Sequence, residues 1–292
     1  MKLAYARWTW DLGVCCYVVL AYSALGGCSR TALLSDSGTV VGAGASVGTG
    51  GTTGTTGTTG DNVGGCGAVH GPQMVTISTP DGGAFCIDST EVTNGQYAEF
   101  LDAHVPTAGQ PAVCSWNDTY TPPQGAWPAA DPEKPVAWVD WCDAAAFCAW
   151  AGKRLCGDIG GGPLSTTTLA DPMASEWTYA CTAAGSRTYP YGDVYSPNAC
   201  VTQHYLWPDP TARVGTIPGC TGGFPGLHDM SGNVAEWQDY AEGESGKDDV
   251  VAWQGGDYDT LASSDLRCVS VTYFNRYIQI GSTGIRCCKD AP

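Results

Sequence analysis

The chain has few basic residues, few histidines and no pair of cysteines at the C-x-x-C spacing. Thirteen Lys and Arg stand against 29 Asp and Glu, so the formal charge is −16, which argues against nucleic acid and anionic lipid head groups as partners. No two cysteines have the C-x-x-C spacing, and the four histidines, His70, His104, His204 and His228, show no ligand spacing. Neither residue type therefore predicts a zinc site.

Glycine, proline and cysteine are abundant by contrast. The chain has 40 Gly and 18 Pro among its 292 residues, so loops and turns are expected to outweigh helices and strands. Fifteen cysteines indicate disulfide bonds and an oxidising compartment.

The N-terminus (residues 1–27) is typical of a lipoprotein signal peptide. Lys2 and Arg7 precede an apolar stretch (residues 12–25) that is too short to span a bilayer comfortably and closes on the letters "LGGC", which resemble a bacterial lipobox. Cys28 would then be the first mature residue and carry lipid. We expect a chain anchored in the bacterial cell envelope, on the outer membrane facing the periplasm or at the cell surface. Ordinary secretion and an uncleaved anchor are the alternatives.

Residues 28–65 are predicted to form a flexible tether. No charged residue occurs from Ser37 to Gly60, and "GTGGTTGTTGTTG" is almost entirely Gly and Thr. Such a composition cannot bury enough apolar surface to fold. The folded domain is therefore expected to occupy residues 66–292.

Capping signals predict two helices in the first half of this domain. Thr93 is the expected N-cap of the first, with Gln96 three residues later completing a capping box. Asp140 is the expected N-cap of the second, with Asp143 in its first turn and Gly152 as its stop.

A third helix is predicted to follow. It has Asp171 as cap, Pro172 at the first helical position and Gly185 as its stop. Strands are expected near Met74 and near Pro135, where the letters read "MVTIST" and "PVAWV". The mixture indicates an α+β domain with long ordered loops.

Six segments of the domain resemble, in order, the formylglycine-generating enzyme (sulfatase-modifying factor) family. They read "IDSTEVTNGQYAEFL", "KPVAWVDWCDAAAFCAWAGKRL", "ASEWTYACTAAGSRTYPYGD", "GLHDMSGNVAEWQDY", "GGDY" and "GIRCC". The resemblance covers nearly all of residues 72–289. It implies a variant of the C-type-lectin-like fold with little regular secondary structure, several disulfides and bound calcium. The segment "KRLCGDIGGGPL" departs from the family, which usually reads Lys-Arg-Leu-Pro-Thr-Glu there.

The segment "GLHDMSGNVAEW" is the predicted calcium site. The resemblance implies two side-chain and two carbonyl ligands: Asp229, Glu236, Gly232 and Val234. A turn can aim several carbonyls at one Ca²⁺, which takes six to eight oxygens in flexible geometry, and glycine permits the required backbone angle. The alternative is a plain turn whose carboxylates cap neighbouring amides. A second family site would begin with Asn198 and the Ala199 carbonyl, but the segment "QHYLWPDPTA" after it diverges.

The copper chemistry of the family is not expected here. The family's enzymes hold Cu(I), a soft ion, on two cysteines separated by four residues, in a loop after an Arg-Gly-Gly-Ser block. In the matching loop, Gln254 to Cys268, counting forward from the glycines places these two positions on Thr260 and Asp265. Counted back from Cys268, the loop is about two residues shorter than the usual enzyme loop, and the positions before it are still not cysteine. Gln254 also replaces the arginine and Asp257 the serine. We expect Cys268 to form a structural bridge.

Twelve of the fifteen cysteines remain once Cys15, Cys16 and Cys28 are set aside, which is consistent with six bridges. The resemblance implies two long-range bridges, Cys148–Cys287 and Cys181–Cys268. Short-range pairing favours two more, Cys66–Cys86 and Cys200–Cys220. The pairing of four stays open: Cys114, Cys142, Cys156 and Cys288. The neighbours Cys287 and Cys288 are expected to reach different partners.

Two classes of function remain. The first is a monomeric, lipid-anchored, calcium-stabilised binding or structural module with an unknown protein or glycan ligand and no oxidase activity. The second is a divergent formylglycine-generating-type oxidoreductase, or another metal-dependent enzyme with a site of its own. An ergothioneine-type iron enzyme would need a histidine-rich helical domain, which these 292 residues do not contain. The missing thiols favour the first class.

Overall fold

The computed structural model describes residues 65–67, 70–205 and 209–292. The predicted signal peptide, Cys28 and almost all of the tether lie outside the described residues. Within the described ranges, every helix is too short or too polar to cross a membrane.

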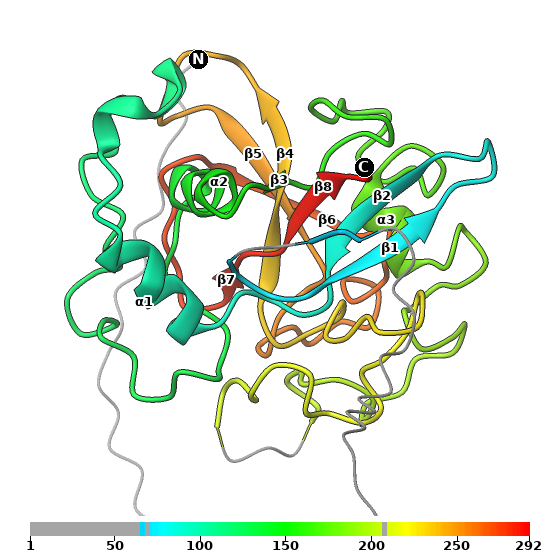
Figure 1. The fold of residues 1–292 in the computed structure, drawn as a ribbon. Helices are drawn as coiled ribbons and strands as arrows, with labels where there is room; N and C mark the ends of the chain where they lie inside the picture. The colour runs from blue at the N-terminus through cyan, green and yellow to red at the C-terminus, as the bar shows by residue number, and fades with distance from the viewer. Residues whose placement is uncertain (1–64, 68–69, 206–208) are drawn as a thin grey trace, which may run out of the picture. The chain divides into compact units, whose positions relative to one another are not determined.

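Two four-stranded sheets organise the domain (Figure 1). The first has the order β1 (Met74–Ser78), β2 (Ala84–Asp88), β8 (Cys287–Asp290) and β3 (Arg154–Leu155), with every pair antiparallel. The second has the order β6 (Val271–Asn275), β5 (Val250–Gln254), β4 (Ala235–Glu242) and β7 (Thr283–Gly284), in which only β4 and β7 are parallel. Because β8 lies between β2 and β3, the first sheet is complete only when the C-terminal strand has paired with strands from the first part of the domain.

Three α-helices and two short 3-10 turns occur in the described residues: α1 (Asn94–Asp102), α2 (Trp141–Trp150), α3 (Glu176–Cys181), Thr107–Gly109 and Ala112–Cys114. The capping box of α1 is confirmed, because Thr93 Oγ1 accepts from the Gln96 backbone N–H at 3.2 Å and Gln96 Oε1 accepts from the Thr93 N–H at 2.9 Å. Asp140 and Asp143 form a second box at the start of α2. Gly152, with φ +69°, lies just past the end of α2.

The predicted start of the third helix was wrong. Its N-cap is Ser175, whose hydroxyl accepts from the Thr178 N–H at 3.2 Å. Asp171 instead accepts from the Met173 N–H at 2.8 Å, which closes a turn around Pro172 before the helix begins. The helix also ends at Cys181, before the predicted stop at Gly185.

The two predicted strands had different outcomes. The strand near Met74 is β1, but the one near Pro135 is absent: Pro135 forms only an isolated bridge with Thr93. The extended run ends because Trp138 has φ +62°, in the left-handed region that non-glycine residues seldom occupy.

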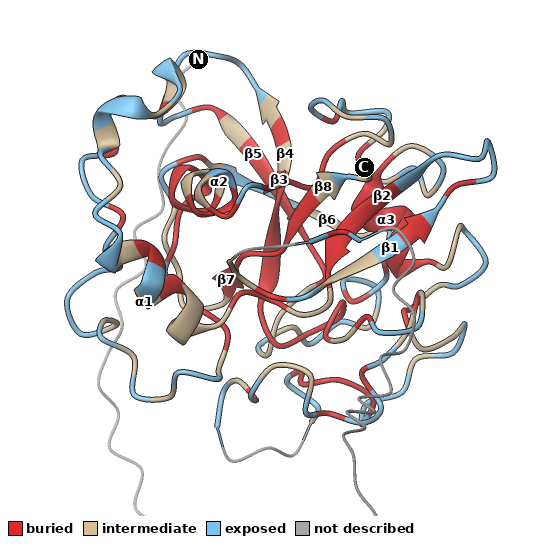
Figure 2. Ribbon diagram, in the orientation of Figure 1, coloured by how far each residue is buried: buried red, intermediate tan, exposed pale blue. Residues whose placement is uncertain are grey.

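The core lies between the sheets and the helices. Tyr97 and Phe100 of α1 and Phe147 of α2 pack with Trp237 of β4 in one cluster, and Trp177 of α3 packs in a second cluster beneath the first sheet. Strands β2 and β4 are buried over most of their length, whereas β6 is mostly exposed (Figure 2).

Six disulfide bonds link all twelve cysteines of the described residues. Four of them join the expected pairs: Cys148–Cys287, Cys181–Cys268, Cys66–Cys86 and Cys200–Cys220. The two bridges that the sequence left open are Cys114–Cys142 and Cys156–Cys288. Adjacent Cys287 and Cys288 therefore reach different partners, and two covalent bonds hold β8 in the first sheet.

The Cys148–Cys287 bridge is expected to stabilise the domain more than Cys200–Cys220. The two bridges span 139 and 20 residues, and the chain-entropy model gives about 5 and about 3 kcal/mol for such loops. Replacing both cysteines of each pair by alanine, followed by urea denaturation, measures the two losses. An equal or smaller loss for the long bridge would contradict this ranking.

Candidate functional site

The segment from Gly226 to Trp237 forms a tight turn with an unusual backbone. Asp229, Gly232 and Asn233 all have positive φ, at 59°, 77° and 59°. The Asn233 N–H donates to the Val201 carbonyl at 2.7 Å. A Cβ at Gly232 would lie 2.2 Å from that same carbonyl oxygen. Only glycine fits this position, because the turn needs both the angle and the close approach.

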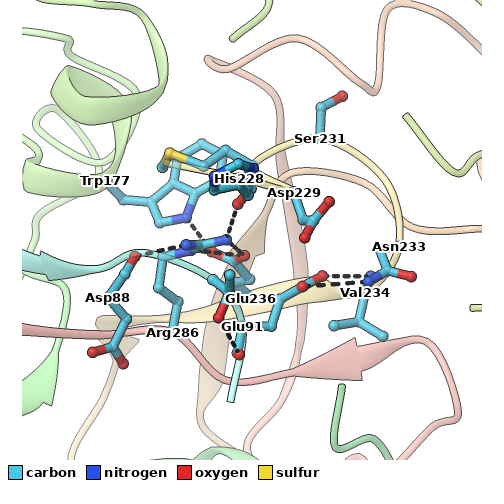
Figure 3. Close-up of polar contacts among 12 residues, drawn as sticks. Asp88, Glu91, Trp177, His228, Asp229, Ser231, Asn233, Val234, Glu236 and Arg286 are labelled. Carbon is cyan, nitrogen blue, oxygen red and sulfur yellow. Dashed lines mark hydrogen bonds and ion pairs between the residues drawn. The ribbon is translucent and has the colours of Figure 1, made fainter. Parts of the chain in front are cut away.

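Glu236, on β4, is held by a buried guanidinium. Arg286 Nη2 lies 2.8 Å from Glu236 Oε1, and Arg286 Nε donates to Oε2 at 2.8 Å (Figure 3). The Trp177 indole N–H from α3 donates to Oε2 at 2.5 Å. Both side chains of the ion pair are at most 1% exposed. The Glu236 carboxylate is thus occupied by protein donors on both oxygens.

Arg286 is also tied to two backbone carbonyls. Its Nη1 donates to the Asp88 carbonyl at the end of β2, and its Nη2 donates to the His228 carbonyl in the turn, each at 2.7 Å. A second buried pair, Lys153 with Asp88, lies beside it. The guanidinium therefore joins the turn and both sheets, and its partner Glu236 adds α3 through Trp177.

Glu91 is a member of this network that the sequence did not identify. It is fully buried and accepts from Asn233 Nδ2 at 3.3 Å and from the Val234 N–H at 3.4 Å. Burial and the neighbouring carboxylates of Asp229 and Glu236 raise the pKa of Glu91 well above its usual range. The sequence offered one signal for Glu91: it is an acidic residue inside the family-like segment "IDSTEVTNGQYAEFL", next to the apolar residue Val92.

Asp229 has little compensation of its own. Its Oδ2 accepts from the Gly215 N–H at 2.5 Å. Burial raises the pKa of Asp229 to about 6, although that N–H and Arg286 both lower it. Three buried carboxylates, Glu91, Asp229 and Glu236, thus interact with the single cation Arg286.

The carboxylates of Glu91, Asp229 and Glu236 suit calcium by their chemistry, but their positions do not form a ready cluster of ligands. Their donor atoms are all oxygens with an excess of negative charge, which a hard divalent cation would neutralise. The three carboxylates do not form a group within 4.8 Å of one another, however. In the part of the chain that the structure describes, the one group of three His, Cys, Asp or Glu donors within 4.8 Å is Cys156, Glu176 and Cys288. The two sulfurs of that group are bonded to each other, so it is no metal site.

The second set of predicted ligands lies in a separate loop. Asn198 is exposed, whereas Ala199 is buried beside Cys200 and Cys220. The Ala199 carbonyl lies against Gly219, where a Cβ would be 2.9 Å from its oxygen. The ligand role of Asn198 and Ala199 stays a prediction.

The loop from Gln254 to Cys268 is fixed by its own polar contacts. Gln254 is buried and donates from Nε2 to the Cys268 carbonyl at 3.2 Å. Asp257 Oδ1 accepts from the Thr260 hydroxyl at 2.8 Å and from the Asp259 N–H at 3.0 Å. The residues that replace the family's arginine and serine therefore support the loop from within.

This loop borders a hollow of about 500 Å³. Thr260 and Asp265, the predicted positions of the family's two thiols, both line it. The other lining residues are Trp138, Trp253, Gly256, Asp257, Tyr258, Asp259, Thr272, Phe274, Ile280, Gly281 and Ser282. The lining contains no sulfur atom, and Cys268 is bonded to Cys181 at 2.01 Å. These residues offer no thiolate pair for a soft metal.

Comparison with known proteins gives one family match and several relatives. Residues 49–291 match the family described as sulfatase-modifying factor enzyme 1-like domain. The formylglycine-generating enzyme of Mycobacterium tuberculosis is 28% identical over 217 residues, which cover 57% of this chain and 67% of that protein. The inactive C-alpha-formylglycine-generating enzyme 2 of Bos taurus is 32% identical over 113 residues, 36% of this chain and 32% of that protein.

Other similarities extend this range of relatives. Hercynine oxygenase of Mycolicibacterium smegmatis is 28% identical over 174 residues, covering 53% of this chain and 36% of that protein. The chain thus spans about two thirds of the first of these relatives and about a third of the other two. Among solved structures, PvdO from Pseudomonas aeruginosa is 21% identical with a TM-score of 0.50, covering 75% of this chain and 94% of that one, which shows a shared fold.

Replacing Glu236 by glutamine is expected to destabilise the domain by about 3–5 kcal/mol, because the buried Arg286 would lose its counter-charge. Urea denaturation measures the loss. Glu133→Gln is the matched control, since Glu133 pairs with Arg213 at the surface, where both side chains are more than half exposed, and such pairs contribute little. Similar losses in both variants would show that the Arg286–Glu236 pair has no special role.

Proposed function

The chain belongs to the sulfatase-modifying factor enzyme 1-like family, and we propose that it is a binding module of the bacterial cell envelope that lacks oxidase activity. The proposal is carried by Thr260 and Asp265, which the family resemblance places at the two thiol positions and which line the hollow. All twelve cysteines in the described ranges are in disulfides, so none offers a thiolate. A relative named as inactive supports the same conclusion.

The leader and the Gly/Thr-rich segment support a tethered arrangement. Cys28 would carry the lipid, and residues 28–65 would hold the domain away from the membrane. The ligand would be a protein or a glycan, bound by a monomeric domain.

Calcium is the proposed structural cofactor, at Asp229 and the carbonyls of Gly232 and Val234. The support is electrostatic: Glu91, Asp229 and Glu236 share one guanidinium, and two positive charges would balance the remaining two carboxylates. Glu236 would act as a ligand only by giving up a contact with Trp177 or Arg286.

The alternative is a divergent formylglycine-generating-type oxidoreductase or another metal-dependent enzyme. The hollow beside Thr260 favours keeping this alternative, since a cavity of that size can hold a substrate. Metal analysis of the purified domain separates the two. Calcium alone supports the module, and stoichiometric copper or iron supports the enzyme.

The domain is expected to leave the cysteine of a sulfatase-type peptide unchanged, even after loading with copper, because it lacks the thiolate pair. Mass spectrometry of the peptide after incubation measures conversion to formylglycine. The Mycobacterium tuberculosis enzyme, run in parallel, is the positive control. Catalytic turnover by this chain would overturn the proposal.

Calcium is expected to raise the melting temperature of the wild-type domain over a chelated sample, by linkage of binding to folding. Asp229→Asn should reduce this rise. Asparagine tolerates the positive φ of residue 229 and leaves the Arg286–Glu236 pair intact, so this variant is more informative than one at Glu236. The rise should be larger near pH ~7.5 than near pH ~5, because the Asp229 carboxyl, with its pKa raised to about 6, must lose its proton to bind.

Asp118→Asn is the control for the charge change, because Asp118 is exposed and away from the turn. Identical melting curves of the wild-type domain with calcium and with chelator would leave the plain turn as the function of this segment.

A further inference from the structure

The hollow beside the Gln254–Cys268 loop combines aromatic walls with unpaired carboxylates. Trp138, Trp253, Tyr258 and Phe274 contribute rings, and Asp257, Asp259 and Asp265 contribute carboxylates. No lysine, arginine or histidine is among the lining residues. The hollow therefore has a net negative charge beside four aromatic rings.

The three carboxylates have only neutral partners. Asp257 accepts from the Thr260 hydroxyl, Asp259 from Gln203 Nε2 at 3.2 Å, and Asp265 from the Ser264 hydroxyl at 2.9 Å. None of them takes part in the ion pairs found among the described residues. The pKa of Tyr258, another lining residue, is raised by its burial and, to a smaller extent, by the negative charges of Asp257 and Asp259.

Trp138 is held at the hollow in an exposed position. Its side chain is one of the exposed large apolar groups, at 42%, although its backbone adopts φ +62°. Gly281 makes room for the ring, because a Cβ there would lie 2.9 Å from Trp138 Nε1. Phe274 stacks on Trp253 with ring centroids 4.1 Å apart, which adds a second aromatic surface to the same hollow.

The chemistry of this lining identifies the kind of ligand. Aromatic faces and carboxylates both attract cations, and a neutral ligand would leave the carboxylates uncompensated. A hollow of about 500 Å³ is in the size range of sites for organic molecules. The carboxylates of Asp257, Asp259 and Asp265 do not form a group of three within 4.8 Å of one another, so the lining offers separate charges and not one cluster of metal ligands.

We propose that this hollow binds an organic ammonium or guanidinium group, presented either by a basic side chain of a partner protein or by a small free amine. The proposal rests on the proposed function, since it names the ligand chemistry of a binding module. The cation would lie against Trp138 with Asp265 and Asp259 as counter-charges. Its affinity would fall as salt is raised, because exposed charges are screened.

Isothermal titration calorimetry of the purified mature chain tests the proposal with four probes. Nα-acetyl-lysine amide carries the cation on a peptide-like group, and n-butylamine carries it on a free amine. Nα-acetyl-norleucine amide is the neutral isostere, and methyl N-acetylglucosaminide represents a neutral glycan. Both cationic probes should bind and both neutral probes should bind at least about fivefold more weakly. A tighter lysine probe points to a protein partner, and equal affinities point to a small amine.

Matched variants locate the binding in the hollow. Asp265→Asn and Trp138→Ala should each weaken the lysine probe about threefold or more. The controls make corresponding changes elsewhere: Asp248→Asn makes the same change at another exposed carboxylate, and Tyr277→Ala removes another exposed aromatic ring. Neither residue lines the hollow. Unchanged melting temperatures show that the variants remain folded.

Three results would overturn the inference: no binding of either cationic probe, equal binding of the norleucine or glycan probe, or equal effects of Asp265→Asn and Asp248→Asn. None of them bears on the absence of oxidase activity. That part of the proposed function stands or falls on the cysteine-peptide assay, so the two failures are distinguishable.

Discussion

The buried ion pair of Arg286 and Glu236 is the contact on which the arrangement of this domain depends. Glu236 lies on β4 in the second sheet, while Arg286 lies just before β8 of the first, and Trp177 joins them from α3 (Figure 3). The same guanidinium donates to carbonyls at the end of β2 and in the turn at His228. A buried charge is tolerated only when its partners are all in place. The pair therefore requires both sheets, α3 and the turn to be assembled together.

The same network explains why the turn combines a fixed backbone geometry with an excess of negative charge. Its glycine and its positive φ angles are set by backbone contacts with Val201 and Gly255. Its excess charge comes from Glu91 and Asp229, because Arg286 already compensates Glu236. A structural turn and a calcium site are thus not exclusive readings of one segment. The geometry belongs to the turn, and the uncompensated carboxylates would supply the attraction for a cation.

Features that depend on neighbouring residues were predicted from the residues themselves, whereas contacts between distant residues were predicted only where the family resemblance implied them. The capping box at Thr93 and the end of α2 near Gly152 follow from local hydrogen bonds and glycine. The third helix was misplaced because Asp171 and Ser175 are both good caps, and Asp171 closes a turn instead. The missing strand at Pro135 reflects the strained Trp138, which contacts Gly281 far along the chain. Glu91 was missed because its partners Asn233 and Val234 lie more than a hundred residues away. The Cys156–Cys288 bridge stayed open although Cys148–Cys287 spans a similar number of residues, because only the latter was implied by the family resemblance.

The Gln254–Cys268 loop is separate from the two sheets and the Arg286–Glu236 pair, so the chemistry of its side chains can change while the fold is kept. The Gln254–Cys268 loop is anchored at one end by β5 and at the other by the Cys181–Cys268 bridge, and Gln254 links the two ends through the Cys268 carbonyl. Residues between these anchors, such as Thr260 and Asp265, can therefore change without disturbing the ion pair or the sheets. In the predicted correspondence, a hydroxyl and a carboxylate stand where the family has thiols, which would remove ligands for a soft metal and add negative charge beside exposed aromatic rings. Because function lies in sites and not in the fold itself, the charge of this hollow is a better guide to the ligand than the family's chemistry.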